Sequence, residues 1–201
     1  MFIQVIEGHT SDPEALHRRI EVWQEELQPG AIGYLGSAGG CTADGSFVMA
    51  VRFTDRTSAE RNAQRAEQTE WWSGTEVYLD GPVSFHETED VHVMAHGSLD
   101  DAGFVQVMEG HVSDRSKAER LENEADPLLA ELRPDLLGSI TAYFDDDEYA
   151  DMAFFTSERE ARENERSDMP PEFAERFDQW EKVMKVDRYL DISDPWVTSA
   201  T

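Results

Sequence analysis

An internal repeat constrains the fold of this chain more than any other feature of its sequence. Residues 2–12, FIQVIEGHTSD, recur 102 positions later as residues 104–114, FVQVMEGHVSD. Eight of the eleven positions are identical, and two of the other three exchange one apolar residue for another. Agreement of this kind does not arise by chance, so the chain is a tandem duplication. We assign residues 1–95 to the first repeat and residues 103–201 to the second, with residues 98–103 as a linker.

The order of secondary-structure elements can be predicted within each repeat. In the first, a strand rich in β-branched residues is followed by Ser11-Asp12-Pro13, which marks a helix start because a capping residue precedes proline. The sequence then predicts a glycine-rich extended segment, a turn, a returning strand, a second helix and a last strand, at residues 32–41, 43–45, 46–53, 57–78 and 83–89. The second repeat follows the same β-α-β-β-α-β order, and Pro127 should kink its first helix or restart it after Asp126.

This order of elements is ferredoxin-like. A four-stranded sheet with both helices on one face leaves its other face bare, and two such sheets can cover each other within one chain. We therefore expect an α+β protein made of two tandem ferredoxin-like domains that pair into an intramolecular arrangement like a dimeric α/β barrel. Such a chain would be a monomer with an internal pseudo-dimer, and further homodimerisation remains open.

Composition excludes several classes of partner. The chain has 43 acidic and 17 basic residues and a formal net charge of -26, so its field repels nucleic acid and anionic membrane surfaces. A single cysteine, Cys41, excludes an intramolecular disulfide and a cysteine-based metal cluster. The N-terminus has no basic segment followed by a long apolar run, and no stretch of about 18 apolar residues occurs. These features predict a soluble cytoplasmic protein with no nucleic-acid or membrane partner.

Two segments of the first repeat carry a family resemblance. The opening strand FIQVIEGH, and the run Arg61-Asn62 … Glu67-Gln68 … Trp71-Trp72 followed by PVSF at residues 82–85, resemble the antibiotic-biosynthesis-monooxygenase-like branch of the dimeric α+β barrel superfamily. The resemblance covers the whole chain, once per repeat. It implies a ligand pocket between sheet and helices. Members of the branch include cofactor-free oxygenases of aromatic polyketides, haem-degrading monooxygenases and domains without established activity.

The haem-degrading members differ from this sequence at the positions that matter. They use an asparagine on the first strand, a tryptophan on the second helix and a histidine further along that helix as the iron ligand. Here the first strand has Gln4, and neither residues 64–78 nor residues 156–184 contain a histidine. We therefore expect no haem and assign no cofactor.

A histidine at the end of the first strand is the first catalytic candidate. Glu7 and His9 share a strand face, and the same pair recurs as Glu109 and His111. A neighbouring carboxylate and imidazole could perform general acid–base chemistry or bind a metal. The alternative is structural, because Glu-Gly-His can also serve as a polar exit from the strand into the turn that caps the helix.

The paired tryptophans of the first repeat are the strongest chemical signal. Neighbouring residues on a helix point in different directions, so one of Trp71 and Trp72 should pack in the core. The other could line an aromatic pocket with Tyr34, Tyr78 or Trp23. Core packing of both is the alternative. The second repeat has no tryptophan pair, so we predict that any site lies in the first repeat and that the second is mainly structural.

Two functions are consistent with these signals. The first is cofactor-independent oxidation of a small aromatic or polyketide-like substrate. Its candidate catalytic residues are His9, Trp72 and Tyr34. Its candidate substrate-binding residues are Arg52, Asn62, Trp71 and His86. The second is a non-catalytic stress-response or small-ligand-binding role on the same scaffold. Histidines 86, 92 and 96 match no familiar metal-ligand spacing, so we predict a flexible surface location for them and no metal site.

Overall fold

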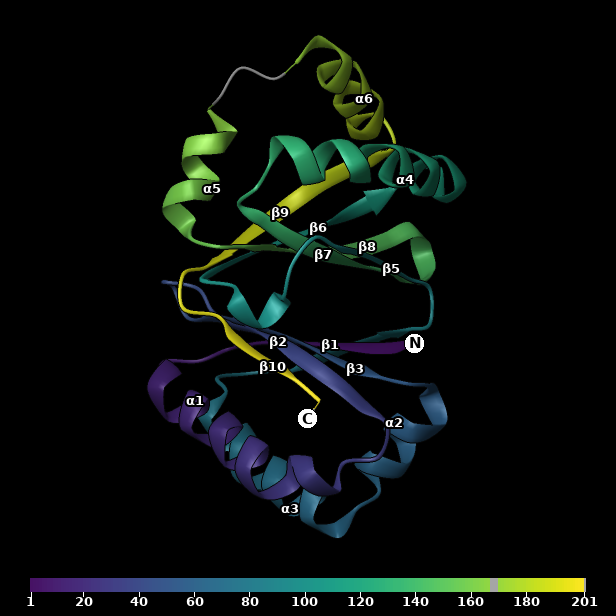
Figure 1. Ribbon diagram of the computed structural model, residues 1–201. Helices are drawn as coiled ribbons and strands as arrows, with labels where there is room; N and C mark the ends of the chain where they lie inside the picture. Colours follow the sequence, from purple (N-terminus) through teal and green to yellow (C-terminus); the bar gives the residue numbers. More distant parts are fainter. Residues whose placement is uncertain (167–169, 201) are drawn as a thin grey trace. The chain divides into compact units, whose positions relative to one another are not determined.

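The protein was analysed as a computed structural model that describes residues 1–166 and 170–200, with the side chains of 172 and 173 left out. Its chain separates into two compact units, unit 1 (Met1–Asp90 with Asp194–Thr201) and unit 2 (Val91–Ser193). Figure 1 shows each unit as one sheet with its helices on one face.

Unit 1 begins with the predicted order of elements. The strands and helices are β1 (Phe2–His9), α1 (Pro13–Val22), β2 (Tyr34–Cys41), β3 (Ser46–Phe53), α2 (Arg56–Ala63), α3 (Ala66–Thr75) and β4 (Ser84–Thr88). Single turns of other helix types, η1 (Trp23–Leu27), η2 (Gln28–Gly30) and η3 (Glu76–Tyr78), extend α1 and α3. The start of α1 is fixed as the sequence predicts, because the Asp12 side chain accepts a hydrogen bond from the Ala15 amide at 3.0 Å and Pro13 opens the helix.

Unit 2 repeats the arrangement. Its elements are β5 (Val91–Ala95), η4 (Leu99–Asp101), β6 (Phe104–Val112), α4 (Arg115–Leu132), β7 (Leu136–Tyr143), η5 (Asp145–Asp147), β8 (Glu148–Phe155), α5 (Glu158–Glu165), α6 (Pro171–Glu181) and β9 (Met184–Ile192). The ferredoxin-like α+β class is therefore confirmed in both repeats.

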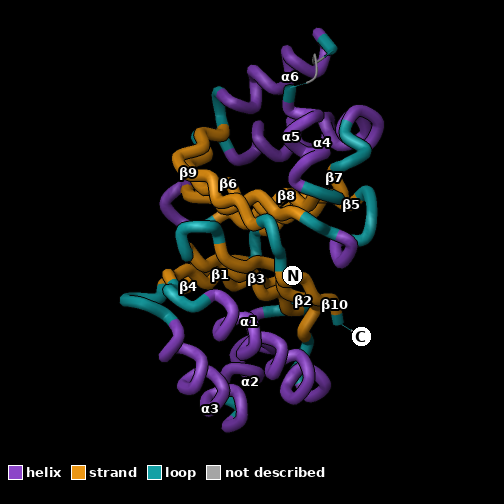
Figure 2. Tube along the Cα trace, turned by 90° about the vertical axis from the view of Figure 1, so that its left-hand side faces the viewer, coloured by secondary structure: helices purple, strands orange, loops and turns teal. Residues whose placement is uncertain are grey.

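Each sheet gains a fifth strand from outside its own repeat. The unit 1 sheet has the order β10-β2-β3-β1-β4, in which β10 (Trp196–Ser199) comes from the end of the second repeat. The unit 2 sheet has the order β5-β7-β8-β6-β9, in which β5 comes from the end of the first repeat. All strand pairs are antiparallel, and in the tube of Figure 2 the strands of each unit form one orange layer with that unit's helices on one side.

Two helices differ in detail from expectation. The helix predicted over residues 57–78 is divided between α2 and α3, because Arg65 takes an extended backbone conformation. Helix α4 runs through Pro127 as a single helix, so the predicted alternative of a restart after Asp126 does not occur.

The core of unit 1 lies between its sheet and its helices. Apolar residues on the helix-facing side of the strands pack against α1 and η1, and one cluster consists of Phe2, Trp23, Leu27, Tyr34 and Phe53. A second cluster contains Ile6, Leu16, Ile20, Phe47, Met49, Leu79 and Trp196. Because side chains alternate along β1, Phe2, Gln4 and Ile6 share the face that points toward the helices.

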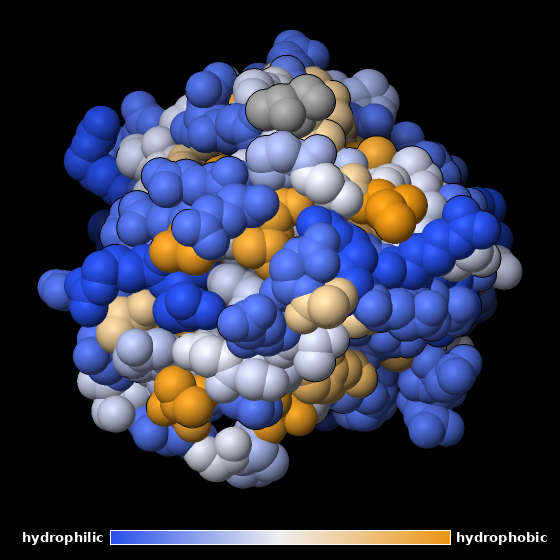
Figure 3. Space-filling model, turned by 90° about the horizontal axis from the view of Figure 1, so that it is seen from below, coloured by the Kyte–Doolittle hydropathy of each residue, from blue (hydrophilic) through white to orange (hydrophobic). Residues whose placement is uncertain are grey.

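The outer surface carries the charge. Figure 3 shows one face of the molecule, where hydrophilic residues cover most of the area and hydrophobic side chains form small separate patches. In the described part of the chain, no helix is both long and apolar enough to span a membrane.

Candidate functional site

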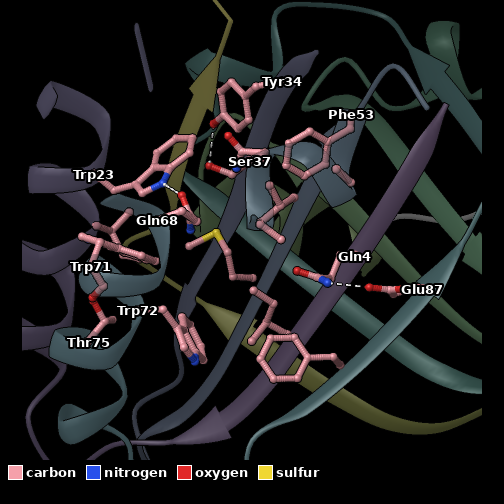
Figure 4. Close-up of a pocket in the computed structure, with 18 of the residues that line it drawn as sticks. Gln4, Trp23, Tyr34, Ser37, Phe53, Gln68, Trp71, Trp72, Thr75 and Glu87 are labelled. Atoms are coloured by element: carbon pink, nitrogen blue, oxygen red, sulfur yellow. Dashed lines mark hydrogen bonds between the residues drawn. The ribbon is translucent and has the colours of Figure 1, made fainter. Parts of the chain in front are cut away.

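A cavity of about 380 Å³ lies between the sheet and the helices of unit 1. Strands β1 and β3 supply its floor, and α2 and α3 supply much of its wall (Figure 4). Such a volume falls within the range of small-molecule pockets, which are mostly apolar with a few placed polar groups.

Aromatic rings form one side of this cavity. Trp23 stands 4.9 Å from Tyr34 and 6.4 Å from Trp71, measured between ring centroids. Trp72 lies 6.1 Å from Trp71 and makes an edge contact with Phe85 at 5.4 Å. Rings at these distances offer faces and edges on which a further aromatic ring can stack.

Three hydrogen bonds fix polar groups on the cavity wall. The Trp23 indole N–H donates to Gln68 at 2.7 Å, and the Tyr34 hydroxyl donates to Ser37 at 2.9 Å. The Gln4 amide donates to Glu87 at 2.7 Å. Figure 4 shows all three pairs among the residues that line the cavity. These bonds orient the side chains in advance, so the wall presents fixed polar edges rather than mobile ones.

Both members of the tryptophan pair reach the cavity. Trp71 is anchored, because its indole N–H donates to the Arg19 carbonyl at 2.8 Å. Trp72 is half-buried and packs on the second apolar cluster of unit 1. The two rings therefore share the wall, while Trp71 also contacts the cluster around Trp23.

The structure brings together four of the seven residues that the sequence analysis singled out. Those that line the cavity are Tyr34, Asn62, Trp71 and Trp72. Asn62 is 4% exposed, and its side-chain oxygen accepts a hydrogen bond from Arg65 at 2.9 Å.

The other three residues lie away from this cavity. His9 is exposed; its Nε2 lies 2.9 Å from the Asp44 carbonyl and its Nδ1 lies 3.6 Å from Asp80. Arg52 and His86 sit on strand positions that alternate with the cavity-facing ones, and His86 lies 3.6 Å from Glu7.

The cysteine of β2 is unsuited to nucleophilic chemistry. Cys41 is partly buried and packs on the second apolar cluster of unit 1. Burial raises the pKa of its thiol to about 11, so the thiol stays protonated at neutral pH.

A second and larger cavity, of about 1030 Å³, lies within unit 2. Its lining includes His92, Glu122, Thr141 and Asp151. The second repeat was predicted to be mainly structural, and this set was not among the predicted site residues. The sequence signal that could have revealed it is the alternation Val91-His92-Val93-Met94, which is typical of a strand. That segment was assigned to the end of the first repeat, so no further strand was predicted there.

The expectation of flexible surface histidines is wrong for two of the three. His92 lies on β5, with its side chain 18% exposed and its Nδ1 3.3 Å from Glu122. His96 bonds to Asp126 at 2.6 Å, and its side chain is 13% exposed. Both are held because β5 pairs with β7, a long-range contact that local sequence does not reveal.

Equivalent rows of residues cross the two sheets. In unit 2 the row runs from β5 to β9 through His92, Thr141, Asp151, Met108 and Tyr189. In unit 1 the matching row runs from β10 to β4 through Trp196, Gly39, Met49, Ile6 and Phe85. The positions of His92, Thr141 and Asp151 in unit 2 carry Trp196, Gly39 and Met49 in unit 1, so the two rows differ in polarity at these three positions.

Neither row is arranged as a metal site. Among the described residues, no group of three or more histidine, cysteine, aspartate or glutamate side chains is placed to hold a metal ion.

Comparison with known proteins locates the fold. No family model matches the chain, and no curated protein matches it in sequence. Two solved structures named "putative monooxygenase", from Lactobacillus acidophilus and Fusobacterium nucleatum, each match with a TM-score of 0.71. The first is 10% identical and covers 98% of this chain and 99% of its own; the second is 9% identical and covers 100% and 92%.

An anthrone oxidase-like protein matches with a TM-score of 0.64 and 10% identity, over 99% of this chain and 93% of its own. All three matches extend through both repeats. The chain therefore shares its tandem α+β fold with these three proteins.

Proposed function

We propose that this chain binds a small aromatic molecule in the cavity of unit 1. The observation that carries the proposal is the wall formed by Trp23, Tyr34, Trp71 and Trp72, whose rings stand 4.9 to 6.4 Å apart. A ligand ring can stack or make edge contacts there, and hydrogen-bonded side chains at the margin can orient a hydroxyl or carbonyl group.

The polar groups favour a ligand that has one oxygen substituent. The carboxylate of Glu87 is held by Gln4 at 2.7 Å and by Arg56 at 3.0 Å, and it reaches the cavity from β4. A phenolic hydroxyl can donate to such a carboxylate. Of the residues singled out from sequence, Tyr34, Asn62, Trp71 and Trp72 would contact this ligand, whereas His9, Arg52 and His86 would not.

Calorimetric titration with 1-naphthol tests the binding proposal. The control ligand is decahydro-1-naphthol, which has the same carbon skeleton and hydroxyl but no aromatic ring. Because ring contacts contribute about 0.5–1.5 kcal/mol beyond buried area, 1-naphthol should bind several-fold more tightly. Equal affinity for the two compounds, or binding of neither, would show that the aromatic wall does not select a ligand.

A second candidate function is cofactor-independent oxidation of the same ligand. The full-length likeness to proteins named as monooxygenases and as anthrone oxidase-like favours it. In the oxidation of anthrone, the ring CH₂ carbon loses two hydrogens and gains one oxygen atom of O₂, and the second oxygen atom leaves as water. Glu87 would accept the proton that forms the anthrone enolate, and Trp72 would hold the ring in place.

Oxygen uptake with anthrone tests this chemistry. The protein should consume one O₂ for each anthraquinone formed and should exceed the rate of spontaneous oxidation in buffer. A Glu87→Gln variant keeps the hydrogen bond of Gln4 to an oxygen but removes the base, so it should bind anthrone and lose the excess rate. A native protein that binds anthrone without accelerating O₂ uptake leaves ligand binding as the function and rules out the oxidation.

A further inference from the structure

The floor of the unit 2 cavity carries ionisable side chains. The function proposed for unit 1 does not involve them. Asp151 is 8% exposed and accepts a hydrogen bond from the Thr141 hydroxyl at 2.8 Å. Glu122 reaches the same region from α4, where the Tyr143 hydroxyl donates to it and His92 stands 3.3 Å away. Two carboxylates and one imidazole thus meet at the bottom of a cavity of about 1030 Å³.

The ion pair of Glu122 is with His92, and the Arg115 guanidinium nearby stacks on the Tyr143 ring, 3.5 Å from its centroid. In the residues that the structure describes, the ion pairs of Glu122 and Asp151 include no arginine or lysine. Burial raises the pKa of Asp151 to about 6, with Glu122 adding to the rise and the hydroxyl of Thr141 opposing it. At neutral pH the group is still mostly ionised, so the cavity floor is a poorly solvated anionic surface.

The basic side chains around this cavity are already engaged elsewhere. Four of them line it, and each lies close to its own carboxylate: Arg133 with Asp135, Arg162 with Asp191, Arg176 with Glu124, and Lys185 with Asp187. They therefore do not supply the positive charge that the floor lacks.

A core tyrosine beside the floor, outside the residues that line the cavity, has an unpaired hydroxyl. Tyr149 stands two residues before Asp151 on the same face of β8 and is 2% exposed. Its hydroxyl makes no hydrogen bond with any described residue.

The walls above this floor are apolar. They include the side chains of Met94, Met108, Leu121, Leu129 and Trp180. Methionine side chains adapt to ligands of irregular shape, and the Trp180 ring can attract a cation to its face. The cavity therefore combines a hydrophobic wall with an anionic floor.

The comparison between repeats shows that this chemistry is specific to unit 2. The positions of His92, Thr141 and Asp151 in the cross-strand row are held in unit 1 by Trp196, Gly39 and Met49. The α4 position of Glu122, counted from the capping aspartate of each helix, is held in α1 by Ile20. The fold can fill this region with apolar residues, so the polar set is not required to build the scaffold.

We infer that the unit 2 cavity is a second binding site, and that it takes a small hydrophobic amine in its protonated form. The ammonium group would donate hydrogen bonds to Asp151 and Glu122 at the floor. The hydrocarbon part would lie against the methionines, the leucines and Trp180. The strongly negative chain, with its net charge of -26, would also attract such a cation from solution.

Calorimetric titration of the full chain tests this inference with two probes of the same length. 3-Phenylpropylamine carries the ammonium group, and 3-phenylpropan-1-ol replaces it with a hydroxyl. At about pH 8 the amine should bind at least about tenfold more tightly, since a charge-assisted hydrogen bond in a desolvated site is stronger than a neutral one. Equal affinity for the two probes would overturn the inference.

Variants of the floor locate the site. Asp151→Asn keeps an acceptor for Thr141 and removes the charge, so it should abolish most of the preference for the amine over the alcohol. Glu122→Gln should reduce this preference in part. Met49→Leu, at the matching position of unit 1, should leave the preference unchanged. Selective amine binding that survives both floor variants, with native circular dichroism, would place the amine elsewhere and contradict the inference.

The pH dependence adds a third readout. Asp151 is faced by Thr141 and Ser139 on β7, Glu122 on α4, His92 on β5 and Tyr149 on β8. Lowering the pH from about 8 to about 5 protonates Asp151, so affinity for the amine should fall through about pH 6 while affinity for the alcohol stays constant. An amine affinity independent of pH in this window would exclude Asp151 as its partner.

Discussion

Met49 and Asp151 occupy equivalent positions in the two repeats, on the third strand of each. Met49 pairs with Gly39 and Ile6, and Asp151 pairs with Thr141 and Met108. One position is filled by a buried thioether and the other by a buried carboxyl group. The duplicated scaffold therefore supports one apolar and one acidic cavity floor.

The buried carboxyl group should make the protein less stable at neutral pH than at mildly acidic pH. The pKa of Asp151 is about 6 in the folded chain against an ordinary 3.8. A raised acid pKa means that the folded state binds the proton more tightly than the unfolded state. This group's contribution therefore becomes unfavourable as pH rises from about 4 to about 6 and stays so above that range.

Asp151→Asn should remove this penalty. We expect urea unfolding at about pH 8 to show a variant more stable by on the order of 2–3 kcal/mol, with the difference disappearing towards about pH 4. A variant that is less stable at about pH 8 would mean that the carboxylate is well compensated in the folded protein.

The repeated Glu-Gly-His motif contains a glycine that is required in only one copy. A Cβ atom on Gly110 would lie 1.9 Å from the Lys185 carbonyl oxygen, at an irregularity in the pairing of β6 with β9. A Cβ atom on Gly8 would lie 3.5 Å from the nearest atom, on the Leu79 side chain.

Alanine substitution should therefore separate the two glycines. Gly110→Ala should cost about 2 kcal/mol or more in unfolding free energy, because backbone has to move. Gly8→Ala should stay within about 1 kcal/mol of the native protein, since alanine also reduces the entropy of the unfolded chain. Thermal and urea unfolding of the two variants side by side measure the difference, and similar losses for both would contradict it.

The thiol of Cys41 should react slowly with disulfide reagents. Burial raises its pKa to about 11, so little thiolate is present at about pH 8. Reaction with 5,5′-dithiobis(2-nitrobenzoate) should be much slower in the native protein than in the protein unfolded by urea. Native and unfolded rates that agree would show that the thiol is freely accessible.

Trp72 should select aromatic ligands without being essential to the fold. It lies half-buried on the cavity wall beside Phe85. Trp72→Leu should weaken binding of 1-naphthol by about fivefold or more, through loss of ring contacts and buried area. The control is Trp180→Leu in unit 2. It should leave the affinity for 1-naphthol unchanged and should lower the affinity for 3-phenylpropylamine.

Local signals in the sequence predicted much of the fold. The duplicated FIQVIEGHTSD motif, the Asp12-Pro13 helix start and the alternation along β1 all correspond to observed elements. What local sequence did not reveal was the pairing of β5 with β7 and of β10 with β2. Edge strands of this kind are selected by tertiary contacts far along the chain rather than by propensity.

The same limit explains why one candidate site was visible in the sequence and the other was not. The Trp71-Trp72 pair is visible as a sequence signal, and both rings line the unit 1 cavity. The set of His92, Glu122 and Asp151 comes from three separate elements, β5, α4 and β8, with nothing in their spacing to join them. Only the register of the sheet brings these residues together.

A crystal structure of the protein grown with 1-naphthol tests the central claim most directly. The account predicts the two-ring ligand inside unit 1, against Trp72 and Phe85, with its hydroxyl within hydrogen-bonding distance of Glu87. A unit 1 cavity that stays without ligand, with 1-naphthol absent or bound only at the surface, would contradict the account.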